Sequence, residues 1–215
     1  MNATLRRLLQ EGSAVARSDG TLHTIFPTSV SHDVGDALRT WVERERATNT
    51  LEIGLGYGIS ALFICDGLKA VGNEHARHVA VDPNQSTRFA NCGLQFIEEA
   101  GFDELVEFHA VPSERALPQF LTEGRSFDLA FVDGNHRFDG IFVDLAYLNR
   151  LVRRSGVVLV DDYQLPAVAK AVSFCITNLG WTLEATSSED PLHHWAALRL
   201  PTEPDNREYD YYVDF

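Results

Sequence analysis

The chain has few cysteines, and their spacing excludes the small folds that depend on them. Only three of its 215 residues are cysteine (Cys65, Cys92 and Cys175), and no two of them form a C-x-x-C pair. An odd number of widely spaced cysteines supports neither a disulfide framework nor a zinc ribbon. We therefore expect each to pack as a small apolar residue in a reducing compartment, which we take to be the cytoplasm.

Long apolar segments and an excess of basic charge are also missing. No run of the sequence approaches the roughly 20 apolar residues that span a bilayer, so we expect no membrane partner. The formal net charge is −13, and the pI is near 4.9. Because so acidic a surface repels a phosphate backbone, we expect no nucleic acid as a partner either.

The composition that remains, 45% hydrophobic and 23% charged, is typical of one globular α/β domain. From residue 50 onward, apolar runs alternate with segments of helical spacing, which predicts a mostly parallel sheet with helices on both faces. The expected strands are residues 50–52, 78–82, 106–110, 127–133 and 156–161, and the expected helices are residues 86–100, 113–121, 138–152 and 166–179.

Both ends of the chain differ from this alternating core. Residues 4–15 have an amphipathic pattern, and a second helix is expected from Val30, so residues 1–48 form an N-terminal helical segment. The core spans residues 49–200 and ends in two apolar runs, 181–185 and 194–200, which predict an antiparallel hairpin at the sheet edge. Residues 201–215 form an acidic, tyrosine-bearing tail.

Residues 50–60 predict a strand, a glycine-rich turn and the start of a helix. Glycines there can adopt positive φ and let a ligand approach the backbone, and such crevices lie at the carboxyl ends of strands in open α/β sheets. A dinucleotide fingerprint, G-x-G-x-x-G, would need a glycine where Ile59 stands. The pattern is instead E-x-G-x-G-x-G-x-S.

This pattern resembles the first motif of the class I S-adenosylmethionine-dependent methyltransferases, although another Rossmann-like βα turn could look similar. The resemblance implies that Gly54, Gly56 and Gly58 shape the wall against the methionine part of the cofactor, and that Ser60 contacts its carboxylate. It also implies that residues 29–33 belong to a lid over the cofactor.

Further residues fit a nucleoside ligand. Asp82, which is followed by Pro83, stands about 20 residues after the glycine turn, where dinucleotide folds place a ribose-binding acid, although it could also cap the next helix. The resemblance places Ser113 and Glu114 beside the adenine. Glu52 would either neutralise the amino group of the cofactor through water or hold the turn.

Carboxylates end four of the expected core strands: Glu52, Asp82, Asp133, and the pair Asp161 and Asp162. Grouped like charges repel unless a cation lies among them, and all-oxygen ligands suit Mg²⁺, although strand-end acids can also be helix caps. Here the sequence resembles the metal-dependent small-molecule O-methyltransferases of the catechol, caffeoyl-CoA and macrolide-sugar type. The resemblance implies that Asp133, Asp161 and Asp162 bind the metal.

His136 stands where catechol-type enzymes of this kind have a lysine as general base. An imidazole titrates near neutral pH and could replace it, although His136 could also be a solvated loop residue or a partner of Asp133. We therefore predict a Mg²⁺-assisted O-methyltransferase that acts on a small hydroxylated molecule, with Asp133 and His136 at the reacting atoms. A homodimer is compatible with the sequence.

Three alternatives stay open. The first is a metal-independent methyltransferase in which the acids are structural. The second is a nicotinamide-dependent oxidoreductase, which Ile59 argues against. The third is a non-catalytic module that binds S-adenosylmethionine and tolerates loss of His136.

Overall fold

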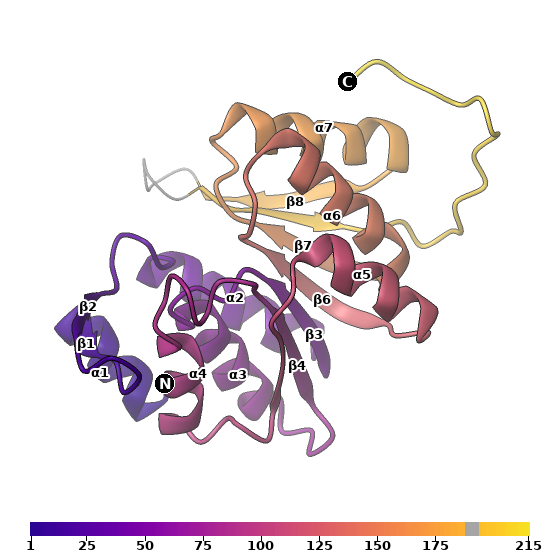
Figure 1. Ribbon diagram of the computed structural model, residues 1–215. Coiled ribbons are helices and arrows are strands. Elements are labelled where there is room, and N and C mark those ends of the chain that lie inside the picture. Colours follow the sequence, from indigo (N-terminus) through magenta and orange to yellow (C-terminus); the bar gives the residue numbers. More distant parts are fainter. Residues whose placement is uncertain (188–193) are drawn as a thin grey trace.

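The computed structural model describes residues 1–187 and 194–215 and is built on a seven-stranded sheet (Figure 1). The strand order is β5-β4-β3-β6-β7-β9-β8, in which β9 pairs antiparallel with both β7 and β8 and the other pairs are parallel. This confirms the predicted sheet and its antiparallel end. The strands are β3 (Asn49–Ile53), β4 (Arg77–Val81), β5 (Val106–His109), β6 (Phe127–Val132), β7 (Val152–Val160), β8 (Thr182–Thr186) and β9 (Ala196–Arg199).

Helices cover both faces of the sheet, as Figure 1 shows. Side chains alternate along β6, so that Leu129 and Phe131 pack into one buried cluster, while Ala130 and Val132 pack into the other. The first cluster lies under α1 to α4 and the second under α5 to α7. The helices are α1 (Ala3–Glu11), α2 (His32–Glu45), α3 (Ile59–Val71), α4 (Cys92–Glu99), α5 (Ser113–Thr122), α6 (Phe138–Leu151) and α7 (Pro166–Leu179).

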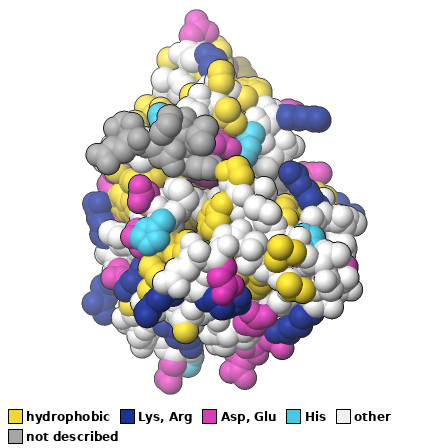
Figure 2. Space-filling view, turned by 90° about the vertical axis from the view of Figure 1, so that its left-hand side faces the viewer, with side chains coloured by type: hydrophobic (Ala, Val, Ile, Leu, Met, Phe, Trp, Pro, Cys, Tyr) yellow, Lys and Arg dark blue, Asp and Glu magenta, His cyan; other side chains and the backbone are white. Residues whose placement is uncertain are grey.

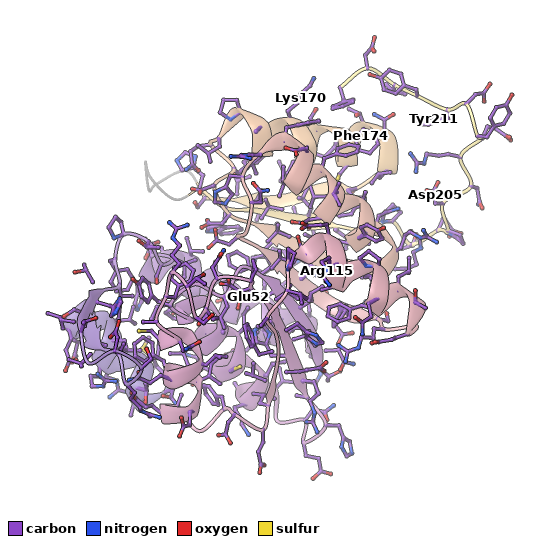
Figure 3. All side chains as sticks on the ribbon, in the orientation of Figure 1. Glu52, Arg115, Lys170, Phe174, Asp205 and Tyr211 are labelled. Atoms are coloured by element: carbon purple, nitrogen blue, oxygen red, sulfur yellow. The ribbon has the colours of Figure 1, made fainter. Side chains whose placement is uncertain are left out.

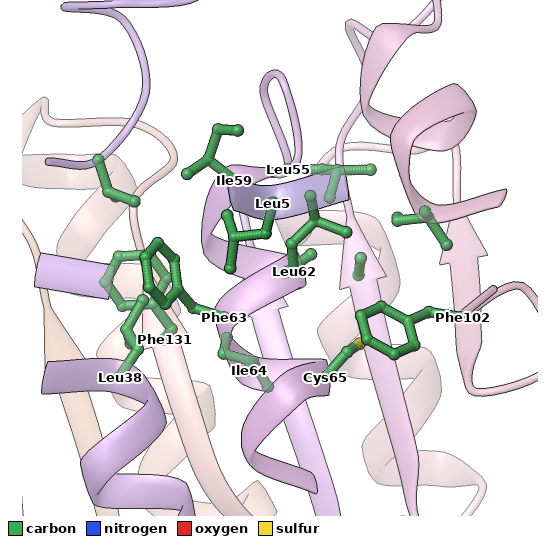
Figure 4. Close-up of a cluster of buried hydrophobic side chains, with 14 of the residues drawn as sticks. Leu5, Leu38, Leu55, Ile59, Leu62, Phe63, Ile64, Cys65, Phe102 and Phe131 are labelled. Atoms are coloured by element: carbon green, nitrogen blue, oxygen red, sulfur yellow. The ribbon is translucent and has the colours of Figure 1, made fainter. Parts of the chain in front are cut away.

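Helix α3 lies at the centre of the first cluster, where Leu62, Phe63 and Ile64 are completely buried (Figure 4). Helix α2 packs closely on it because Gly35 leaves room for the ring of Phe63; a Cβ at position 35 would collide with that ring. Since α3 begins directly after the glycine turn, this packing fixes the direction in which the turn leaves the sheet.

The predicted N-terminal helix is shorter than expected. It ends at Glu11, because Gly12 takes a left-handed conformation with φ of 64° and its N–H bonds to the Leu8 carbonyl. The prediction was wrong for the next residues: β1 (Ser13–Val15) pairs antiparallel with β2 (Leu22–Thr24).

The predicted helix over residues 86–100 is also shorter and begins at Cys92. Ala90 and Asn91 have positive φ, which interrupts any helix before that residue. Strand β3 continues to Ile53, so Glu52 lies within it and not at its end, and β7 begins at Val152, four residues before the expected start at Gly156.

Charged side chains of both signs are interspersed over the face of the molecule in Figure 2. The three cysteines are free and buried, as predicted. Within the two described stretches of the chain, no helix combines the length and the apolar character that crossing a membrane requires.

The C-terminal tail leaves the sheet and returns to α7 (Figure 3). Its last residues are anchored there: the buried Asn178 exchanges two hydrogen bonds of 2.8 Å with the backbone of Val213, and the ring of Phe215 packs edge-on against Phe174. Asp205 and Tyr211 lie on the part of the tail between the sheet and this anchor, and Asp205 borders a pocket that α6 and α7 also line.

Helix α6 carries a buried acid, Asp144, whose side chain lies near Ser113 of α5. Burial raises the pKa of Asp144 to about 6, although the Ser113 hydroxyl favours the carboxylate. The folded state therefore keeps a proton to higher pH than the unfolded chain, whose Asp pKa is about 3.9. The free energy of unfolding should fall as the pH rises between these two values.

We predict that Asp144→Asn removes this fall and stabilises the protein at pH 7 by up to about 3 kcal/mol. Urea unfolding at pH 4, 5, 6 and 7 measures the effect. The matched control is Asp139→Asn, at an exposed position of the same helix. A variant at position 144 that is as pH-dependent as the wild type would contradict the prediction.

Candidate active site

A cavity of about 510 Å³ opens at the carboxyl-terminal edge of the sheet, over the glycine turn and beneath residues 28–30. It brings together most of the predicted cofactor residues, while Glu52 and Gly58 lie buried behind its wall. The predicted residues that line it are Gly54, Gly56, Ser60, Asp82, Pro83, Ser113, Glu114, Asp133 and His136. Those that the sequence did not single out include Tyr57, Asn84, Arg88 and Phe89.

Gly54 and Gly58 of the turn have different structural roles. Gly54 has φ of 94°, and a Cβ there would collide with the carbonyl oxygen of Asp133, so this glycine lets β3 and β6 end side by side. Gly58, with φ of 77°, precedes α3 and packs closely on Gly93 of α4. It therefore supports the wall from behind.

Asp82 holds the glycine turn in place. Its Oδ2 accepts hydrogen bonds from the backbone N–H groups of Leu55 and Gly56 at 3.1 and 2.8 Å, and its Oδ1 accepts one from Asn84 at 2.6 Å. Gln85, which sequence reasoning missed, donates to Oδ2 of Asp82 and to the carbonyl of Gly56. These four hydrogen bonds use about as many acceptor sites as a carboxylate has. A contact of Asp82 with a ribose therefore stays a prediction.

Aromatic rings flank one side of the cavity. Tyr57 and Phe89 lie edge to face with centroids 5.2 Å apart. Tyr57 lies between Gly56 and Gly58 of the turn, and this position in the sequence could have predicted that its side chain faces the cavity. Phe89 gave no such signal, because its segment was expected to be helical. Ser29, in the expected lid, places a buried hydroxyl on the cavity wall, and this hydroxyl has no hydrogen-bond partner within the described chain.

Three of the predicted catalytic and metal residues meet at one end of the cavity. His136 lies between two carboxylates: its Nε2 is 3.4 Å from Asp133 Oδ1, and its Nδ1 is 3.3 Å from Asp162 Oδ2. One potential ligand atom from each of these residues lies within 4.8 Å of the others. The predicted metal set was Asp133, Asp161 and Asp162, so the observed group contains His136 in place of Asp161.

Asp161 lies beside this group and is nearly completely buried. Its Oδ1 has no hydrogen-bond partner among the residues that the structure describes. Burial, and then the charges of Asp133 and Asp162, raise the pKa of Asp161 to about 8. The neighbouring Asp133, opposed by burial, raises the pKa of His136. A third negative charge beside Asp133 and Asp162 is therefore unfavourable unless a proton or a cation accompanies it.

This donor set fits a divalent cation. Carboxylate oxygens are the ligands that Mg²⁺ prefers. An imidazole nitrogen next to them is a ligand for other divalent metals, such as zinc. A cation would relieve the repulsion that raises the pKa of Asp161. Residues that could hold one are therefore Asp133 and Asp162, with Asp161 and His136 beside them.

Glu52 is completely buried and does not line the cavity, whereas Ser60 does. Its Oε2 is 3.5 Å from Nε2 of His78, a second completely buried polar side chain. No sequence feature pointed to His78, because a single histidine in an apolar strand resembles any other strand residue.

Known proteins match this chain over its central part. The family described as Methyltransferase domain matches residues 51–163. A caffeoyl-CoA O-methyltransferase-like protein of Arabidopsis thaliana is 31% identical over 169 residues, which cover 74% of this chain and 69% of that protein. Caffeoyl-CoA O-methyltransferase 2 of Petunia hybrida is 32% identical over 110 residues, 50% of this chain and 43% of its own length. The matched segment thus spans less than half of the latter protein.

Solved structures match nearly the whole chain. An O-methyltransferase from Bacillus cereus, in complex with S-adenosylhomocysteine, has a TM-score of 0.73 at 19% identity and covers 93% of this chain and 91% of its own. The O-methyltransferase TomG from Streptomyces achromogenes, in complex with S-adenosylmethionine, has a TM-score of 0.71 at 23% identity and covers 94% and 91%. At these identities the likeness establishes the fold.

The sequence matches and the seven-stranded sheet agree with the resemblance carried by the glycine turn. The chain therefore belongs to the methyltransferase-domain family, within the group of S-adenosylmethionine-dependent O-methyltransferases of the caffeoyl-CoA O-methyltransferase type.

Proposed function

We propose that this protein transfers the methyl group of S-adenosylmethionine to a hydroxyl group of a small molecule, with the assistance of Mg²⁺. One observation carries the proposal: Asp133 and His136 line the same cavity as the glycine turn and also belong to the acidic cluster with Asp162. The reactive methyl group of a donor bound in the cavity would thus lie beside the residues that could hold a cation and the acceptor.

The cavity is large enough for the cofactor, since small-molecule sites usually measure about 300–1,000 Å³. Its lining supports one orientation. The methionine part would lie against Gly54 and Gly56, and the adenine would lie towards Ser113 and Glu114 at the start of α5. The complexes of the two bacterial relatives with S-adenosylhomocysteine or S-adenosylmethionine support the choice of ligand.

Asp133, Asp161 and Asp162 would hold the metal ion, as the residues at the ends of β6 and β7. A bound Mg²⁺ lowers the pKa of an acceptor hydroxyl and orients it. Among the described residues, the buried Oδ1 of Asp161 has no hydrogen-bond partner, which supports its inclusion, although the group of potential ligand atoms found there comes from Asp133, His136 and Asp162.

His136 would take the proton of the acceptor hydroxyl. Its contacts with Asp133 and Asp162 stabilise the imidazolium, which makes the neutral ring a better proton acceptor. As the acceptor oxygen forms its bond to the methyl carbon, the bond from that carbon to sulfur breaks and leaves a neutral thioether. The walls of the cavity contribute by holding oxygen, carbon and sulfur in line.

We predict that calorimetric titration detects S-adenosylhomocysteine binding to the wild type, and Mg²⁺ binding that is lost in Asp162→Asn and in Asp161→Ala. The physical reason is that each variant removes one of the charges that attract the ion. Asp103→Asn, at an exposed position that does not line the cavity, is the matched control and should bind Mg²⁺ like the wild type.

The possible results separate the alternatives. Cofactor binding without a Mg²⁺ signal, both with and without a catechol as acceptor, would favour a metal-independent methyltransferase. An absence of cofactor binding would overturn the proposal and revive the nicotinamide alternative.

We also predict that His136→Gln lowers kcat about 10²- to 10⁴-fold, because the proton acceptor is lost. Its affinity for S-adenosylhomocysteine should change little, since His136 lies at the acceptor end of the cavity. Methyl transfer to a panel of catechols and other hydroxylated compounds measures kcat. His75→Gln, at a strongly exposed position, is the control, and full activity of His136→Gln would exclude the histidine as base.

A further inference from the structure

The turn that follows β7 carries a polar side chain, Gln164, to which the proposed function assigns no role. Gln164 is half-buried and lies two residues beyond Asp162. The N–H of Leu165 donates to the carbonyl of Asp162 at 2.8 Å, which closes the turn. The glutamine is thereby folded back onto the carboxylate of the acid that precedes it.

Two hydrogen bonds fix the amide group of Gln164. Its Nε2 donates to Asp162 Oδ1 at 2.8 Å, and its Oε1 accepts from the backbone N–H of His194 at 3.0 Å. A carboxylate can only accept and a backbone N–H can only donate, so these two partners determine which end of the amide is the nitrogen. The two ends have different partners, which restricts rotation of the side chain.

The second partner, His194, belongs to a distant part of the sequence. It stands 30 residues after Gln164 and just before β9, the strand that pairs antiparallel with β7. Its carbonyl also accepts a hydrogen bond of 2.7 Å from the N–H of Tyr163. The backbone of His194 is therefore bound on both sides to the turn after β7, and the position of Gln164 depends on where β9 begins.

This arrangement determines which oxygen of Asp162 faces the acidic cluster. Because Gln164 binds Oδ1, the other oxygen, Oδ2, lies 3.3 Å from Nδ1 of His136. Asp162 follows the sheet in a flexible type of structure, a turn, where an aspartate side chain without a partner could rotate away from Asp133 and His136. A cation needs its ligand atoms at nearly fixed distances, and groups that hold a ligand in place contribute to the affinity for the ion.

We propose that Gln164 is a positioning residue for the acidic cluster: it holds Asp162 with Oδ2 towards His136, and it ties this orientation to the entry of β9 at His194. The inference rests on the proposed function in taking a divalent cation as the ligand of this cluster. It adds that a residue outside the cluster controls how well the cluster binds the ion.

The test replaces Gln164 by methionine, which has nearly the same length and volume but cannot donate a hydrogen bond to Asp162. We expect Gln164→Met to weaken Mg²⁺ binding about 10- to 100-fold. The affinity for S-adenosylhomocysteine without Mg²⁺ should stay within about twofold of the wild type, because Gln164 is not among the described residues that line the cavity. Calorimetry measures both ligands, with and without a catechol as acceptor.

Two further variants make the result specific. Gln164→Ala should weaken Mg²⁺ binding as much as Gln164→Met, which would show that the new apolar group is not the cause. Gln119→Met is the matched control: Gln119 is exposed on α5, donates to Oε1 of Glu123 at 2.7 Å, and should leave both affinities unchanged. Thermal unfolding without Mg²⁺ shows which variants are folded, and Gln164→Ala tests the inference if Gln164→Met does not fold.

Methyl transfer provides a second readout. A residue that only positions a metal ligand should raise the Mg²⁺ concentration needed for half-maximal activity, while saturating Mg²⁺ restores kcat. A variant that damages the fold in general would lose kcat at every Mg²⁺ concentration.

Four outcomes would overturn the inference. If the folded variants bind Mg²⁺ like the wild type, Gln164 does not position Asp162 for the ion. If they lose Mg²⁺ and S-adenosylhomocysteine affinity equally, Gln164 serves stability alone. If the wild type binds S-adenosylhomocysteine but not Mg²⁺, the inference fails and a metal-independent methyltransferase remains. If the wild type binds neither ligand, the proposed function fails as well.

Discussion

The parallel hydrogen-bonded ladder across β5, β4, β3, β6 and β7 is the constraint on which the site depends. The N–H of Asp133 donates to the carbonyl of Ile53, and the N–H of Gly54 donates to the carbonyl of Val81, both at 2.9 Å. Gly54 and Asp133 can therefore lie in contact where the two strands end, because the glycine has no Cβ. A side chain at position 54 would separate the glycine-lined end of the cavity from Asp133 and the residues beside it.

The same ladder assembles charges that would otherwise move apart. The N–H of Asp161 donates to the carbonyl of Val132 and the N–H of Asp82 donates to the carbonyl of His109, so the backbone places each acid. Asp162 follows in a left-handed conformation with φ of 54°, which is uncommon for a residue other than glycine. The stability of the sheet thus holds like charges close together, and a bound cation would reduce their electrostatic repulsion.

Much of this arrangement could be predicted from the sequence, because it depends on strand ends. The acids after β6 and β7 were found from apolar runs that stop at Asp133 and at Asp161. The side-chain contacts could not be predicted. His136 lies between two carboxylates because of the path of its loop. Glu52 is buried because β3 continues for one residue beyond the expected end, to Ile53. Three of the four hydrogen bonds accepted by Asp82 come from backbone N–H groups, which leave no trace in the sequence pattern.

The position of β9 has a consequence for biosynthesis. Among the strands of the sheet, β9 is the last to be made, yet it lies inside the sheet between β7 and β8, and Ala196 to Leu198 are completely buried. Until the ribosome has released this segment, the apolar Val157–Val160 part of β7 remains an open edge that can pair with another chain. A product of translation that stops before residue 196 would therefore retain the glycine turn and the acidic residues, but would be prone to aggregation.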